Sequence, residues 1–290
     1  MYPKISIVTP SFNQGHFIEE TIRSVLSQEG NFSIDYLVMD GGSSDASPEI
    51  IRKYDELLRD GKWPVKCKGI RYRWVSEKDN GQVDAIQRGF ARAEGDIGGW
   101  LNSDDDFLDE NVFAKVVSEF GNDHNLMILT GDGPFIDREG KSFGVHHVDA
   151  IDFTELLYLD YHILQPATFL RNPLYKDEPL DASYHYCFDA EYFIRLISKG
   201  YPYKKVDTMF ACFRLYPETK TLSGLGRRYR ESLRIAAKYG RNRLHYIVAA
   251  CYRYFEIVLQ NRHPGNAAVK RTTGLLRPLA YRLVVGRWGR

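Results

Sequence analysis

Hydrophobic and polar positions in the first hundred residues predict strands separated by helices. Short apolar runs, rich in β-branched residues, lie at residues 5–9, 34–39, 70–75 and 97–101, and each predicts a strand. Between these runs, apolar residues return every three or four positions, which is the spacing of a helix with one buried face. A repeated order of strand and helix predicts an α/β fold, with a mostly parallel sheet flanked by helices.

Beyond residue 125 this alternation stops. Residues 126–130 and 135–137 predict two further strands, and the polar residues after them predict a hairpin turn. Apolar residues with helical spacing predict a helix over residues 188–198, and Gly200 suits its C-terminal end. From residue 226 onward only helical spacing is present, which predicts an α-helical C-terminal extension.

The composition is that of a folded protein with a substantial core. Of the 290 residues, 43% are hydrophobic and 13% are aromatic, which excludes an intrinsically disordered chain. The length suits one large α/β domain with an appendage, and it exceeds that of a small binding module.

Several features favour a cytoplasmic location. The N-terminus leads directly into a predicted strand and lacks the pattern of a secretory signal. The longest apolar run, residues 246–259, contains Arg253 and Glu256 and is shorter than the roughly 20 residues that span a bilayer. The cysteines are too sparse for a disulfide framework, and none has metal-ligand spacing. They are Cys67, Cys187, Cys212 and Cys251.

Charge is distributed unevenly along the chain. The formal net charge is +1, yet residues 227–290 hold 15 Lys and Arg against only Glu231 and Glu256. This end therefore carries +13 and leaves −12 on residues 1–226. Such an imbalance indicates an anionic partner for the C-terminal extension, either a membrane surface or nucleic acid. The sequence has no nucleic-acid recognition motif, so we expect no nucleic-acid partner and favour peripheral attachment to the cytosolic face of an anionic membrane. A helical lid with a solvated basic face is the alternative.

Acidic residues follow successive predicted strands at the points where the strands end. Asp40 follows the second strand, Glu77 and Asp79 follow the third, and the run 104–106 follows the fourth. The carboxyl ends of parallel strands meet at one edge of a sheet, where ligands bind in such folds. Carboxylates brought together repel one another unless a cation or sugar hydroxyls lie between them. Each Asp alone could instead cap a turn, but together they favour a ligand site.

Six motifs along the chain resemble the successive signatures of family-2 glycosyltransferases. The resemblance extends over roughly residues 4–222, and the order and spacing of the motifs make it specific. The motifs are ISIVTPSFN at 5–13, DGGSSD at 40–45, SEKDNGQVDA at 76–85, WLNSDD at 100–105, QPATF at 165–169 and DAEYFIRL at 189–196.

This resemblance implies a GT-A fold, which is the Rossmann-like fold of nucleotide-diphospho-sugar transferases. It also implies two domains, with a catalytic domain at residues 1–222 and a basic helical extension at 223–290. The nucleoside of the donor would be held by the first and second strand ends, at Thr9, Pro10, Phe12 and Asp40. An Asp suits this role because its carboxylate can accept a hydrogen bond from a base N–H.

The resemblance places further donor contacts after the third strand. Asp79 and Asp84 would line the donor, and Arg88 is a candidate for binding its phosphates. Arg88 could equally lie on a solvated helix face.

The metal motif of the family is Asp-x-Asp, and here it reads Asn102-Ser103-Asp104. Asp104 would bind Mn²⁺ or Mg²⁺, which would bridge the donor diphosphate, while Asn102 would contact the sugar. Asp105 is a reserve ligand. A second departure is Tyr216, which stands where many relatives have a metal-binding His and is itself a poor ligand for a hard cation. Metal affinity should therefore depend on the bound donor.

The catalytic base of such enzymes corresponds to Asp189. It would take the proton of the acceptor hydroxyl during an inverting displacement at the anomeric carbon. Asp189 could also cap the helix that follows it, and Glu191 is the next candidate for the base.

We therefore expect an inverting, metal-dependent transferase that moves a sugar from a nucleotide-diphosphate donor to a glycan or lipid-linked glycan. Cell-surface polysaccharide, capsule or lipopolysaccharide biosynthesis would be its setting. A non-catalytic sugar-nucleotide-binding protein is the alternative, given Asn102 and Tyr216. A dinucleotide oxidoreductase is disfavoured because no Gly-x-Gly-x-x-Gly follows the first strand.

Overall fold

The computed structural model describes residues 2–147, 150–159, 161–220, 224–262, 278–280 and 282–286. The chain divides into two compact units. The first comprises Met1–Asp149, Leu164–Ala182 and Tyr201–Tyr216, and the second comprises Ala150–Ile163, Ser183–Gly200 and Pro217–Arg290. The predicted boundary at residue 222 falls outside the described residues, so the division at that point stays a prediction.

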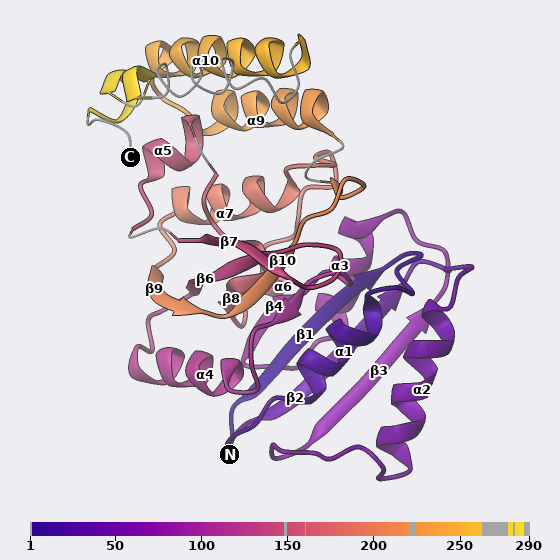
Figure 1. The fold of residues 1–290 in the computed structure, drawn as a ribbon. Helices are drawn as coiled ribbons and strands as arrows, with labels where there is room; N and C mark the ends of the chain where they lie inside the picture. The colour runs from indigo at the N-terminus through magenta and orange to yellow at the C-terminus, as the bar shows by residue number, and fades with distance from the viewer. Residues whose placement is uncertain are drawn as a thin grey trace. The chain divides into compact units, whose positions relative to one another are not determined.

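The first unit contains the strands of the described chain, joined in one sheet (Figure 1). They are β1 (Lys4–Ser11), β2 (Ser33–Asp40), β3 (Ile70–Ser76), β4 (Ile97–Trp100), β5 (Asp106–Phe107), β6 (Ile128–Ile136), β7 (Ser142–His146), β8 (Thr168–Arg171), β9 (Tyr203–Met209) and β10 (Ala211–Arg214). Their order is β3-β2-β1-β4-β8-β6-β10-β5, and β7 and β9 also pair with β6. Strands β1 to β4 are parallel, as the alternation predicts, whereas β8 is antiparallel to both β4 and β6.

Helices flank both faces of this sheet. They are α1 (Ile18–Leu26), α2 (Ser47–Arg59), α3 (Gln82–Arg92), α4 (Val112–Asn122), the short 3-10 helix η1 (Gln165–Ala167) and α6 (Leu174–Asp177). Ile5 and Ile7 of β1 join one buried core with the apolar residues of α1, α2 and α4. Val8 points to the opposite face, where a Cβ on Gly89 of α3 would lie 2.4 Å from its Cγ1. The alternation along β1 thus places its residues in two cores.

One predicted feature of the sheet is wrong. The strands predicted at residues 126–130 and 135–137 are a single strand, β6. In the sequence, a break between two strands is suggested by Gly131, Gly133 and Pro134. In the structure the two glycines instead allow a neighbouring segment to pack closely against β6. A Cβ on Gly133 would lie 1.7 Å from the carbonyl oxygen of Ala211, so only glycine fits there.

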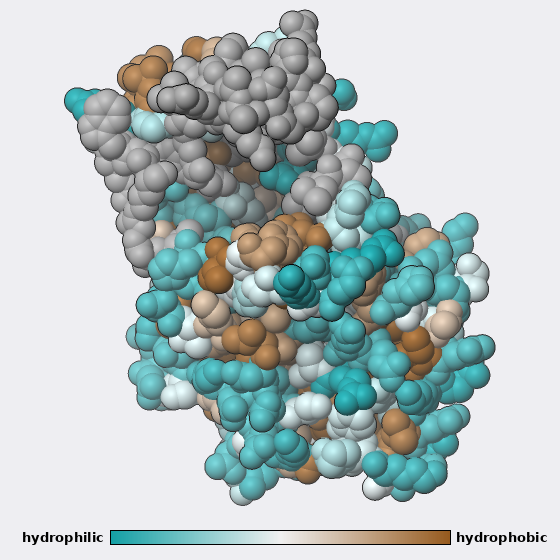
Figure 2. Space-filling view, viewed as in Figure 1, coloured by the Kyte–Doolittle hydropathy of each residue, from teal (hydrophilic) through white to brown (hydrophobic). Residues whose placement is uncertain are grey.

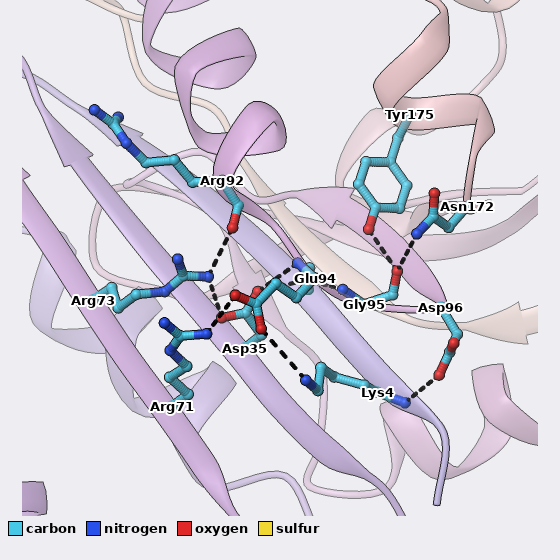
Figure 3. A network of polar contacts seen from close by, with 11 residues as sticks. Lys4, Asp35, Arg71, Arg73, Arg92, Glu94, Gly95, Asp96, Asn172 and Tyr175 are labelled. Carbon is cyan, nitrogen blue, oxygen red and sulfur yellow. Dashed lines mark hydrogen bonds and ion pairs between the residues drawn. The ribbon is translucent and has the colours of Figure 1, made fainter. Parts of the chain in front are cut away.

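A buried acid joins the starts of the first strands, away from their carboxyl ends (Figure 3). Asp35 is 1% exposed and accepts hydrogen bonds from Ser6 Oγ at 2.8 Å, Arg73 Nη2 at 2.5 Å and the main-chain N–H of Glu94 at 2.9 Å. A buried carboxylate is tolerated only when it is paired in this way. The network ties β1, β2 and β3 to the turn before β4, which is a structural role.

The second unit is helical in the part that the structure describes. Its labelled helices are α5 (Phe153–Tyr158), α7 (Phe188–Ser198), α9 (Leu225–Tyr239) and α10 (Arg243–Arg262), and residues 278–280 and 282–285 are also helical. The helix predicted at residues 188–198 is confirmed as α7, and Gly200 after it has φ +84°, as a C-terminal glycine often does. Helices α9 and α10 are joined by a hydrogen bond from the Tyr229 hydroxyl to the carbonyl of Ala250 at 2.7 Å. Among the described residues, no helix is both long enough and apolar enough to cross a bilayer.

Candidate active site

The carboxyl ends of β1, β2 and β3 bring Ser11, Asp40 and Ser76 into register. Asp40 is 2% exposed, and its carboxylate accepts hydrogen bonds from Ser76 Oγ at 2.6 Å and from the hydroxyl and main-chain N–H of Ser43. Gly42 adds a further main-chain N–H at 3.2 Å. Asp40 therefore shapes the loop that follows β2, at the edge where the sequence predicts the nucleoside.

The other predicted nucleoside contacts differ in exposure. The Thr9 side chain is fully buried, and its hydroxyl is 3.0 Å from the hydroxyl of Tyr36. Pro10 is buried beside it. Phe12, just past the end of β1, is 61% exposed. Of these residues, only Phe12 presents a side chain on which a base could stack.

Residues predicted to line the donor gather after β3. Asp79 accepts a hydrogen bond from the main-chain N–H of Gly81 at 2.8 Å, and a Cβ on Gly41 would lie 2.9 Å from its Oδ2. Asp84 accepts from the main-chain N–H of Asn80 at 3.1 Å. The loops after β2 and β3 therefore touch.

Arg88 on α3 forms an ion pair with Glu77. A phosphate would have to compete with this carboxylate for the guanidinium.

Asn102 is held by three neighbours. Its amide nitrogen donates to Asp105 Oδ2 and to Gln165 Oε1, each at 3.1 Å. Its oxygen accepts from Gln82 Nε2 at 2.8 Å. With both ends of the amide engaged, Asn102 fixes the loop after β4.

The three acids of this loop lie in different environments. Asp105 is 1% exposed, and burial, together with the charge of Asp104, raises its pKa well above the usual value. Asp104 is half-buried, which raises its pKa although the Tyr216 hydroxyl opposes the shift. Burial also raises the pKa of Asp106, to about 6. Because Asp105 faces inward, Asp104 is the better placed of these two for a ligand.

Arg214, the last residue of β10, holds the loop after β4 in place through hydrogen bonds. Its main-chain N–H donates to Asp105 Oδ1 at 2.9 Å, and its Nε donates to the Asp104 carbonyl at 2.8 Å. The rest of its guanidinium donates to the carbonyls of Asp137 and Arg138 and to the carboxylates of Glu20 and Asp106. Every N–H of this buried side chain is therefore used, and the position of Asp104 depends on it.

Tyr216 supplies the second contact of Asp104. Its hydroxyl is 3.0 Å from Asp104 Oδ2, and no other side chain among the described residues donates a hydrogen bond to the Asp104 carboxylate. The Tyr216 ring lies 5.1 Å from the Phe17 ring, and the Arg138 guanidinium is 5.2 Å from the Tyr216 ring. Burial and the Asp104 charge raise the pKa of this tyrosine, so it remains a hydrogen-bond donor.

Asp189 belongs to the second unit and is the second residue of α7. The sequence suggests that it could cap this helix, but the N-cap is Cys187, and Asp189 Oδ1 accepts a hydrogen bond from the adjacent Ala190 N–H at 2.8 Å. Burial raises its pKa, while Arg228 and Lys220 lower it by a smaller amount. A carboxylate with a raised pKa is suited to accepting a proton near neutral pH.

Glu191 is a weaker candidate for the base. Its side chain is fully buried, and its carboxylate contacts Lys238 Nζ at 3.0 Å, Arg195 Nε at 3.3 Å and the Tyr239 hydroxyl. These contacts hold α7 against α9.

Comparison with known protein families identifies the family of this chain. The chain matches the family described as glycosyl transferase family 2 over residues 6–186, which is more than half of its length. The chain belongs to glycosyl transferase family 2.

Curated proteins resemble about half of the chain. An uncharacterized glycosyltransferase of Mycobacterium tuberculosis is 32% identical over 150 residues, which is 52% of this chain and 48% of that protein. The chondroitin synthase of Escherichia coli is 27% identical over 139 residues, which is 48% of this chain and 18% of that protein. The chain thus aligns with about half the length of the M. tuberculosis relative.

Solved structures confirm the predicted GT-A fold. S. aureus TarS 1–349, in complex with UDP-GlcNAc, matches with a TM-score of 0.62 at 15% identity, over 97% of this chain and 81% of that chain. A mannosyltransferase from Pyrobaculum calidifontis, in complex with GDP-Man and Mn²⁺, matches with a TM-score of 0.59 at 13% identity, also over 97% and 81%. At these identities the likeness establishes the fold alone.

A second group of potential metal ligands lies elsewhere in this family-2 chain. Oxygens of Asp132 and Asp207 and a ring nitrogen of His147 lie within 4.8 Å of one another. Asp132 is buried, and Lys205 Nζ is 2.8 Å from its Oδ2. Because the Lys205 ammonium already neutralises Asp132, this group is less suited than Asp104 to a divalent cation.

Sequence reasoning missed two residues that shape the site. Arg214, two residues before Tyr216, is not singled out by the sequence, and Glu20 of α1 carries no signal. Their ion pair, 2.6 Å long, joins residues 194 positions apart. The arginine in the FRLY segment, next to the family's metal position, was the one available clue.

Proposed function

We propose that this chain transfers a sugar from a nucleotide-diphosphate donor to an acceptor hydroxyl with inversion at the anomeric carbon. The observation that carries the proposal is the clamped loop Asn102–Asp106, in which Arg214 and Tyr216 fix Asp104 beside the carboxyl ends of the strands. Family-2 membership and the GT-A fold support it. UDP-GlcNAc and GDP-Man in the neighbouring structures make such donors the first to test here.

Asp104 is the residue that would hold Mn²⁺ or Mg²⁺. The donor set fits a hard cation, because the carboxylate is half-buried and Tyr216 is the one other described residue that donates a hydrogen bond to it. Such an ion would stabilise charge on the departing diphosphate. Since the Asn102 oxygen is engaged by Gln82, the ion would need ligands from the donor as well.

Asp189 acts as the base in this proposal. It takes the proton of the acceptor hydroxyl as that oxygen forms a bond to the anomeric carbon. The bond from this carbon to the diphosphate oxygen breaks on the opposite side, and the nucleoside diphosphate leaves with the electron pair. Asp40, Phe12, Asp79 and Asp84 would hold the donor during this step.

A precursor of a cell-surface polysaccharide, capsule or lipopolysaccharide is the proposed acceptor, and it would be lipid-linked at the cytosolic face of a membrane. The basic extension supports this setting, with Arg227, Arg230 and Arg234 exposed on α9. Helix α10 adds Leu244, Ile247 and Tyr254, which are 63%, 55% and 64% exposed. Among the residues that Figure 2 colours, hydrophobic ones lie at the surface at the top of the view, where Figure 1 places α10 and residues 278–280 and 282–286.

These exposed apolar residues are three and seven positions apart, so they form one stripe along α10. Such a stripe, combined with basic residues, suits insertion at the surface of an anionic bilayer.

A sugar-nucleotide-binding protein without transferase activity is the second candidate. The observation in its favour is that Asn102 and Tyr216 replace two family metal ligands and are engaged in hydrogen bonds to the protein.

The deciding experiment incubates the chain with UDP-, GDP- and dTDP-sugars, with and without Mn²⁺. Thermal stabilisation reports binding, and release of the nucleoside diphosphate reports transfer to an acceptor or to water. Binding with no release, in the presence of a membrane glycolipid extract, would favour the second candidate.

A further inference from the structure

The segment just before Asp189 is held by a carboxylate from another helix. Glu231, in the second turn of α9, accepts hydrogen bonds from three successive main-chain N–H groups. The donors are His185 at 2.9 Å, Tyr186 at 2.8 Å and Cys187 at 2.8 Å. Hydrogen bonds to an ionised acceptor are roughly twice as strong as neutral ones. Three in a row therefore fix the backbone conformation of this segment.

Other contacts join the same segment to the start of α9. A Cβ on Gly224, immediately before the helix, would lie 1.9 Å from the Tyr186 ring, so only glycine allows this approach. The Cys187 thiol donates to the Arg228 carbonyl at 3.4 Å, and the Arg234 guanidinium lies 4.6 Å from the Tyr184 ring. Each residue from Tyr184 to Cys187 thus contacts α9 or the glycine before it.

The charges around Asp189 come from this part of the chain as well. Arg228 and Lys220 are the cations that act on Asp189, and Lys220 Nζ lies 5.6 Å from the ring of the adjacent Phe188. Glu231 in turn acts on Lys220. Asp189 lies two residues after Cys187, the last residue whose main-chain N–H Glu231 binds.

We propose that Glu231 is a positioning residue for Asp189, which makes α9 part of the catalytic apparatus rather than an appendage. This inference rests on the proposed function, in which Asp189 is the base. A displacement of a reacting group by about 1 Å can lower turnover by about 100-fold. Loss of the Glu231 contact should therefore reduce turnover far more than donor binding.

The test compares Glu231→Gln with Glu56→Gln, which neutralises an exposed glutamate on α2 as a matched control. Two readouts need no substrate. Amide hydrogen exchange at residues 185–187 should speed up at least about tenfold in Glu231→Gln, since a neutral acceptor with one oxygen replaces the carboxylate. In an NMR titration of the Asp189 carboxyl group, the pKa should fall toward the ordinary value, because a loosened segment admits water.

A third readout tests whether Glu231 acts through Asp189. Release of nucleoside diphosphate from UDP-N-acetylglucosamine and GDP-mannose, with water as acceptor, is followed in both single variants and the double variant with Asp189→Asn. Glu231→Gln should lower kcat by about 100-fold with KM for the donor unchanged. It should add no further loss once Asp189 is replaced.

Parental exchange at residues 185–187 together with a parental Asp189 titration would overturn the inference, whatever the activity. Full activity in Asp189→Asn alone would instead refute the proposed function, while the exchange and titration results would still stand. If Glu231→Gln does not fold, Glu231→Asp replaces it, which keeps the charge on a side chain shorter by one methylene. The changes in amide exchange, in the Asp189 pKa and in kcat are then expected in the same direction but smaller.

Discussion

Tyr216 donates its hydroxyl to Asp104 across 3.0 Å, at the position where the family resemblance expects a metal-binding histidine. The tyrosine orients the carboxylate but offers a divalent cation no good ligand of its own. In the proposed metal site, Asp104 would then be the one strong ligand among the described residues, and cation binding should depend on the phosphates of the donor.

Replacing Tyr216 by histidine should give the proposed metal site a second protein ligand. Tyr216→His is expected to tighten Mn²⁺ binding by about tenfold or more in the absence of donor, because an imidazole joins Asp104. Electron paramagnetic resonance of free Mn²⁺ measures this directly. Tyr216→Phe is the matched control, since it removes the hydroxyl without adding a ligand. Equal affinity in the His and Phe variants would show that residue 216 does not face the cation.

Arg214 should be among the residues most important for stability. Its side chain is buried and donates to five acceptors, so Arg214→Met leaves Glu20, Asp106 and three carbonyls without their donor. Loss of one partner of a buried charge cluster costs about 3–5 kcal/mol. Urea unfolding measures this cost. The control Arg59→Met removes an exposed ion pair with Asp60 and should cost less than about 1 kcal/mol. Similar values for the two variants would contradict the role of Arg214.

Protonation of Asp106 should make the free energy of unfolding depend on pH. Burial raises its pKa from 3.8 to about 6, so the native state keeps a proton that the unfolded chain has released between these values. Its contribution to stability is therefore full below pH 3.8 and is lost as the pH rises toward 6. In Asp106→Asn, the drop in unfolding free energy between about pH 4 and about pH 7 should be smaller than in the parent. An unchanged drop would contradict this assignment.

The sequence predicts the first half of the fold well because local spacing decides it. Apolar runs and helical periodicity identify β1 to β4 with their helices, and the acids at the strand ends mark the edge where the loops meet. The same reasoning divides β6 in two, because Gly131 and Pro134 resemble a turn when their packing partners are unknown.

The site could be predicted only in part, for a physical reason. The family resemblance proposes Asp104 as a metal ligand, but it does not reveal that Asp105 points into the protein or that Asn102 is engaged by Gln82 and Gln165. Those facts depend on contacts between distant segments. The link between Glu231 and the residues before Asp189 is of the same kind.

If Asp189 is the catalytic base, its ionisation should be visible in the pH dependence of kcat. Asp189→Asn is expected to keep donor affinity and to lower kcat by about 10²- to 10⁴-fold. Because burial raises the pKa of Asp189, turnover of the parent should decline on the acid side at a pH above that of an ordinary Asp, since only the ionised form accepts a proton. That limb should disappear in the Asn variant. An unchanged kcat would place the base elsewhere.

Membrane attachment should depend on the stripe of α10. Leu244→Gln with Ile247→Gln removes exposed apolar surface, and sedimentation with anionic vesicles should fall accordingly. Binding of the parent should weaken as salt rises, because each basic residue near the surface contributes about 1 kcal/mol that salt screens. Val65→Gln, at a residue 46% exposed in the first unit, is the control. Equal sedimentation of all three proteins would leave α10 without this role.

The central claim is that Asp104 binds the donor diphosphate through a divalent cation, and calorimetric titration tests it most directly. The parent and Asp104→Ala are titrated with UDP and GDP, each with Mn²⁺ and each with EDTA. The account predicts that Mn²⁺ tightens nucleotide binding in the parent, and that Asp104→Ala, although folded, binds equally weakly with Mn²⁺ and with EDTA. Binding that Mn²⁺ strengthens to the same extent in both proteins would contradict it.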